Sequence, residues 1–64
     1  MKKIPYLEAI ALFMQGYTLY YLDNGVYLQI KVADNVKRSL LNFKKISQEI
    51  KDKLNVKRLK YFTE

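Results

Sequence analysis

The sequence predicts one α+β domain in which a helix, a β-hairpin and a long amphipathic helix are followed by a short C-terminal strand. Length is the first reason, because 64 residues bury too little surface for more than one core, so residues 1–64 form one unit. The second reason is an Asn-Gly pair between two runs of aromatic and β-branched residues, which is typical of a tight hairpin. The third is the helical spacing of apolar residues on either side of that hairpin.

The first element is a helix over about residues 5–15. Pro5 suits the first helical turn, where no backbone N–H is required, and Gly16 suits the left-handed position that ends a helix. The predicted buried stripe has the spacing i, i+3, i+4, i+7 and consists of Leu7, Ile10, Ala11 and Met14, widened by Tyr6 and Phe13.

The hairpin follows, with strands over residues 17–22 and 26–32 and a type I′ turn at Asn24-Gly25. In this register Leu22 lies opposite Tyr27. We expect one face to pack on a helix, and it carries Tyr17, Leu19, Tyr21, Val26, Leu28, Ile30 and Val32. The other face carries Thr18, Tyr20, Leu22, Tyr27, Gln29 and Lys31. Either a helix covers this second face as well, or its tyrosines stay accessible to a ligand.

A helix of about 20 residues is expected next, with Asp34 as its N-cap and its end near Asn55. Its predicted buried stripe consists of Val36, Leu40, Phe43, Ile50 and Leu54, with Ile46 beside it. Residues 56–62 would form the final strand against the hairpin, because a two-stranded hairpin alone is only marginally stable.

An alternative arrangement has a tight turn at Asp34-Asn35, a third strand over residues 36–41 and a shorter second helix that Ser47 caps. This arrangement gives a three-stranded sheet. Such a strand places a basic residue on each of its faces, so charge is buried whichever face packs inward. The long helix is therefore preferred.

The composition argues against an enzyme. The chain has no His and no Cys, so no Ser-His-Asp or Cys-His nucleophile system and no zinc site with nitrogen or sulfur ligands can be assembled. Its two glycines form no phosphate-binding loop. We therefore expect no catalytic residue, no metal and no cofactor. The longest uncharged run, from Ala9 to Leu22, is shorter than the roughly 18 residues that span a bilayer, so we expect a cytoplasmic protein without membrane contact.

Positive charge is concentrated in the C-terminal half of a chain whose net charge is +6. Residues 1–32 carry three lysines and two acids, whereas residues 33–64 carry nine basic residues and four acids. On the predicted helix Lys37, Lys44 and Lys51 are seven apart and form one column, which can either follow a phosphate backbone or be an ordinary solvated face. Lys57, Arg58 and Lys60 extend the basic region, where they can bind phosphates or protect an edge strand.

These features predict a small basic module that binds nucleic acid. Tyr20 and Tyr27 would stack on unpaired bases, while Lys31 and the basic residues of the C-terminal half neutralise phosphates. The alternative is an accessory protein of a phage or mobile element that binds and inhibits or modulates a host protein. In that case the hairpin face or Leu41 makes the contact and the lysines attract an acidic surface. Self-association into a homo-oligomer would enlarge the small core in either case.

The N-terminal region carries one resemblance to known proteins. The run YLEAIALFMQG from Tyr6 to Gly16, followed by YTLYY, resembles the opening of small phage-encoded accessory proteins, including the Thoeris anti-defence 2-like family. In these proteins a helix that contains EAI ends at a glycine and leads into a hairpin. The chain lacks the Trp that such families often carry after the glycine, so no ligand-binding residue is transferred. The resemblance implies a mobile-element origin and a binding role.

Overall fold

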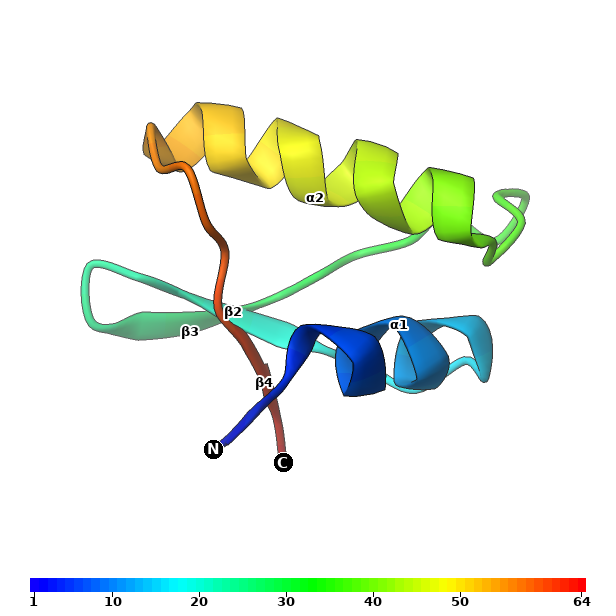
Figure 1. Ribbon diagram of the computed structural model, residues 1–64, viewed down its shortest axis with the longest axis horizontal. Coiled ribbons are helices and arrows are strands. Elements are labelled where there is room, and N and C mark those ends of the chain that lie inside the picture. Colours follow the sequence, from blue (N-terminus) through cyan, green and yellow to red (C-terminus); the bar gives the residue numbers. More distant parts are fainter.

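The computed structural model describes all 64 residues and confirms the α+β class (Figure 1). Four strands form one antiparallel sheet in the order β1-β4-β2-β3. The elements follow one another as β1 (Lys2–Ile4), α1 (Tyr6–Met14), β2 (Tyr20–Asp23), β3 (Val26–Gln29), α2 (Leu40–Leu54) and β4 (Tyr61–Thr63). Because β4 is antiparallel to both β1 and β2, those two strands run parallel with β4 between them.

Helix α1 begins and ends where the sequence predicts, but it turns a different side to the core. Pro5 precedes its first turn, and Gly16 has φ +94°, which allows the Tyr17 amide to donate to the Leu12 carbonyl over 3.0 Å. The predicted inward stripe is wrong at three of its positions. Leu7 (78% exposed), Ala11 and Met14 face solvent, and Ala9 and Phe13 are the buried residues.

Apolar periodicity did not identify the inward side of α1 because the helix is apolar almost all the way round. Glu8 is its only charged residue, so a single side chain marks the solvent side of the helix. A helix of this kind satisfies several apolar stripes equally well. The packing of Phe13 against Phe43 of α2, with ring centroids 5.2 Å apart, decides which side is buried.

The hairpin is confirmed with its register, but its strands are shorter than predicted, Tyr20–Asp23 and Val26–Gln29 in place of residues 17–22 and 26–32. Asn24 (φ +51°) and Gly25 (φ +83°) both have positive φ, as a type I′ turn requires. Tyr20 pairs with Gln29 and Leu22 pairs with Tyr27, as expected from the two-residue loop.

Helix α2 begins later than predicted, at Leu40 rather than after Asp34. Ser39 is its N-cap and accepts a hydrogen bond from the Asn42 amide over 3.2 Å. Asp34 lies in a turn instead, which the Val36 amide closes by donating to the Ala33 carbonyl over 3.0 Å. The alternative is wrong as well, because no strand follows that turn and Ser47 lies inside the helix. Asn55, with φ +56°, ends α2 at the predicted position.

The outer part of the sheet was only partly predicted. The final strand is shorter than expected, since it covers Tyr61–Thr63 and not residues 56–62. Strand β1 was not predicted at all, because Lys2-Lys3-Ile4 shows neither apolar alternation nor β-branched enrichment beyond one residue. Its backbone pairs with β4, so Lys3 lies opposite Phe62.

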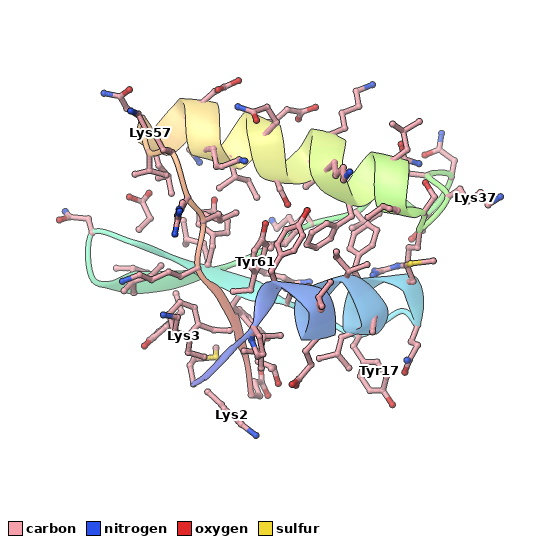
Figure 2. All side chains as sticks on the ribbon, viewed as in Figure 1. Lys2, Lys3, Tyr17, Lys37, Lys57 and Tyr61 are labelled. Atoms are coloured by element: carbon pink, nitrogen blue, oxygen red, sulfur yellow. The ribbon has the colours of Figure 1, made fainter.

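Both helices pack on the same face of the sheet. The buried cluster joins Ala9, Phe13 and Phe43 of the helices to five residues of the sheet side, namely Ile4, Leu19, Tyr21, Ile30 and Tyr61. Figure 2 places Tyr61 between the sheet and the helices, where its hydroxyl donates to the Ser47 hydroxyl over 2.8 Å. The opposite face of the sheet has no helix against it.

Candidate nucleic-acid interface

The face of the sheet without a helix carries a row of four side chains, one from each strand. Lys3 lies opposite Phe62, Phe62 opposite Tyr20, and Tyr20 opposite Gln29. Residues directly opposite in antiparallel strands point to the same face. We use the name open sheet face for this row together with the next pair on the hairpin. Its residues are Lys3, Tyr20, Leu22, Tyr27, Gln29 and Phe62.

Two aromatic rings meet on the open sheet face across the strand that separates them. Tyr27 comes from β3 and Phe62 from β4, and their ring centroids lie 5.0 Å apart at an interplanar angle of 75°. This edge-to-face geometry is a favourable one for aromatic pairs. Phe62 is only 7% exposed, whereas Tyr27 is 41% exposed. Phe62 therefore supports the Tyr27 ring, and Tyr27 presents aromatic surface to solvent.

The hydroxyl of Tyr20 is held at the edge of the same face. It donates a hydrogen bond of 2.6 Å to Oε1 of Glu64, which directly follows β4. Because this bond requires the proton, it raises the pKa of Tyr20 above its ordinary value. The half-buried Tyr20 ring is thereby fixed beside Phe62.

Basic residues near the open sheet face come from three segments of the chain. Lys3 belongs to the row itself. Lys60 is exposed two residues before Phe62, and Lys31 is exposed two residues after Gln29. Lys60 and Lys31 are among the predicted phosphate-binding residues. Lys3 was missed because its strand was missed, and the only available signal was the Lys2-Lys3 pair before an apolar residue.

The remaining predicted basic residues lie elsewhere. Lys44 and Lys51 are on α2, which packs against the other side of the sheet. Lys37 precedes α2, so the predicted helical column of three lysines is wrong at that position. Figure 2 shows Lys37 and Lys57 at opposite ends of α2, away from Lys2 and Lys3. Lys57 and its neighbour Arg58 are exposed in the segment between α2 and β4. Leu41 is 76% exposed on α2 and does not belong to the open sheet face.

No group of three or more Asp or Glu side chains converges to hold a metal ion. Neither helix has the length and apolar content that a bilayer crossing demands. Comparison with protein-family models, curated proteins and solved structures finds no match to the chain.

Proposed function

We propose that the protein binds single-stranded nucleic acid on its open sheet face. The observation that carries this proposal is the row Lys3, Phe62, Tyr20 and Gln29, with Tyr27 beside it, on a face that no helix covers. Aromatic rings on an exposed sheet stack on unpaired bases, as in the RNA-recognition motif, where a four-stranded sheet stacks two or three bases. Such stacking contributes about 1–3 kcal/mol per base.

The arrangement of groups on this face suits a single strand better than a duplex. Tyr27 is exposed on the surface of a sheet, and an unpaired base can lie flat on its ring, whereas the bases of a duplex are already stacked on each other. Gln29 is exposed in the same row and has both a donor and an acceptor for a base edge. Both helices pack on the other face of the sheet, so neither can enter a major groove of DNA bound to the open sheet face.

Positive charge supports phosphate binding at the margins of the face. Lys3 is exposed at the β1 edge, and Lys60 and Lys31 are exposed at the ends of β4 and β3. The net charge of +6 also attracts polyanions over longer distances at low salt. Binding should therefore weaken as salt rises, because each neutralised phosphate releases counterions.

The test is the binding of fluorescently labelled oligonucleotides of about ten nucleotides, measured by anisotropy at about 50 and 200 mM salt. Uridine-rich RNA, thymidine-rich DNA and a DNA duplex of equal length are compared. We expect both single strands to bind more tightly than the duplex. Equal affinity for the duplex, or no binding at the lower salt concentration, contradicts the proposal.

Two pairs of variants separate the open sheet face from general charge attraction. Tyr27→Leu removes an aromatic ring that is 41% exposed on the face, and Tyr17→Leu removes a ring that is 58% exposed outside it. We expect Tyr27→Leu to bind about tenfold more weakly than the wild type and Tyr17→Leu to bind as tightly as the wild type. Lys3→Gln should reduce the slope of log K against log salt by about 0.7, whereas Lys44→Gln on α2 should leave it unchanged. If Lys44→Gln has the larger effect, binding takes place on the helix side.

A further inference from the structure

The two edges of the sheet differ in their protection against pairing with another strand. At one edge, β1 carries Lys2 and Lys3 and is followed by Pro5. At the other edge, β3 has the sequence VYLQ, with no charge and no proline. Proteins commonly protect edge strands with charged residues, prolines or bulges. The edge at β3 is therefore the one that can accept a further strand.

The backbone of β3 has free hydrogen-bonding groups along this edge. The Ile30 amide donates to the Leu19 carbonyl over 2.8 Å, which fixes the side of the strand that faces β2. Successive residues of an antiparallel strand direct their backbone N–H and C=O groups to opposite sides of the strand. The groups of Tyr27 and Gln29 therefore point away from β2. β3 pairs with no other strand, and these groups are open to a ligand backbone.

A groove of about 460 Å³ runs along the same edge, between β3 and α2. Leu28 lines it from the strand, and Ile46 and Ile50 line it from the helix. All three side chains are only half-buried, so they offer apolar surface to an occupant. A strand added beside β3 would direct every second side chain into this groove.

The rim of the groove is predominantly basic. Lys31 and Lys53 line it together with one acid, Glu49. A neighbouring groove of about 280 Å³ shares Lys31 and Glu49 and adds Lys45. An occupant with carboxylates is therefore favoured. A second copy of the chain is disfavoured, because pairing β3 with β3 of the copy brings the same lysines toward each other.

We infer that β3 and α2 form a docking site for an extended acidic peptide segment of a partner protein. The segment adds to β3 as a fifth strand, pairs with the outward backbone groups of Tyr27 and Gln29, and inserts alternate apolar side chains between Leu28 and Ile50. Its carboxylates lie beside Lys31 and Lys53. This site is on the helix side of the sheet edge, and of the basic residues assigned to the proposed nucleic-acid surface it uses only Lys31.

The probe is the blocked synthetic peptide ETVTVTE, in which both Val and both Glu side chains lie on one face of a strand. Amide exchange and amide chemical shifts of the full chain are measured by NMR as the peptide is added. We expect slowed exchange at Tyr27 and Gln29, since these amides become hydrogen-bonded, and shift changes along α2 near Ile46 and Ile50. The reversed-charge peptide KTVTVTK should bind much more weakly.

A matched pair of exposed helix substitutions tests the charge argument without disturbing the core. Lys53→Glu reverses a rim charge, and Lys44→Glu makes the same change outside both grooves. We expect Lys53→Glu to weaken the binding of ETVTVTE by about fivefold and Lys44→Glu to leave it unchanged. Lys53 has no role in the proposed nucleic-acid surface, so Lys53→Glu should weaken peptide binding without a matching loss of oligonucleotide affinity, and the two sites are tested separately.

Three outcomes overturn the inference. The first is the absence of shift changes at millimolar peptide. The second is unchanged amide exchange at Tyr27 and Gln29 together with chemical-shift changes confined to the open sheet face. This result means that the peptide binds to that face as a polyanion. The third is slow exchange of these two amides without peptide in a chain that sediments as a dimer, which means that a second copy occupies the edge.

Discussion

The Tyr20 hydroxyl donates to the Glu64 carboxylate across 2.6 Å and fixes an anionic group beside the aromatic rings of the open sheet face. An anion at this place opposes the approach of phosphates. It also holds the Tyr20 ring in position. The same contact therefore disfavours phosphate binding nearby and orders a ring of the proposed binding surface.

Glu64→Gln should therefore raise the affinity for single-stranded oligonucleotides, because the amide oxygen can still accept from Tyr20 without the negative charge. The gain should be larger at low salt than at high salt. The pKa of Tyr20, followed by the NMR shift of its ring carbon, should move down toward the ordinary value of tyrosine. Unchanged affinity together with a lowered pKa would show that phosphates do not pass near Glu64.

The buried pair of Tyr61 and Ser47 should make the fold sensitive to alkaline pH. Burial raises the pKa of Tyr61 above its ordinary value, although the hydrogen bond to Ser47 acts in the opposite direction. A pKa raised in the folded state gives stability that is complete below the unfolded pKa of about 10 and is lost as pH rises beyond it. The free energy of unfolding should therefore fall above about pH 10 in the wild type and fall less in Tyr61→Phe.

The same pair predicts that Tyr61→Phe is less stable than the wild type at neutral pH. Tyr61→Phe leaves the Ser47 hydroxyl buried without its partner, which should reduce the free energy of unfolding by about 1–3 kcal/mol. Denaturant titrations at neutral and alkaline pH measure both effects. Tyr17→Phe is the control, because that side chain is 58% exposed and should behave as the wild type does.

Arg38 should stabilise the end of α1 even though it lies in the loop before α2. Its Nη1 donates to the Phe13 carbonyl over 3.1 Å and to the Tyr17 carbonyl over 3.4 Å, and its guanidinium lies 5.2 Å from the centre of the Phe13 ring. A cation at a helix C-terminus also interacts favourably with the helix dipole. Arg38→Gln should lower the free energy of unfolding by about 1.5–3 kcal/mol. Arg58→Gln, which changes an exposed residue, should lower it by less than about 0.5 kcal/mol.

The two sides of α1 should respond differently to substitution. Leu7 is 78% exposed, so Leu7→Gln should change the free energy of unfolding by less than about 0.5 kcal/mol. Ala9 is completely buried, and Ala9→Leu should destabilise the fold by about 1–3 kcal/mol because the core has no room for the added atoms. Thermal unfolding of both variants is the measurement. If Leu7→Gln proved more destabilising than Ala9→Leu, the inward stripe predicted from the periodicity would be correct.

Features determined by local chemistry were predictable from the sequence. Asn24-Gly25 determines the hairpin and its register, and Pro5 and Gly16 bound α1, because each acts through its own backbone conformation. The start of α2 was not predictable in this way, since Asp34 and Ser39 are both good N-caps and the choice depends on where Arg38 reaches α1.

The candidate site was predictable to the extent that it belongs to the hairpin. Alternation along the hairpin placed Tyr20 and Tyr27 on one face, and the structure shows that no helix covers that face. Phe62 and Lys3 come from strands of three residues that pair across nearly the whole chain, and no short pattern encodes such a pairing.

The pairing of β1 with β4 also determines when the proposed binding surface can exist. Lys2 pairs with Thr63, so residues from opposite ends of the sequence are neighbours, and both chain ends lie side by side in Figure 1. Long-range pairings of this kind form late, because a large loop must close first. During synthesis the hairpin and α1 can form before β4, which lies between β1 and β2 in the sheet, has been made. The open sheet face is therefore incomplete until β4 has been synthesised and has paired with β1 and β2.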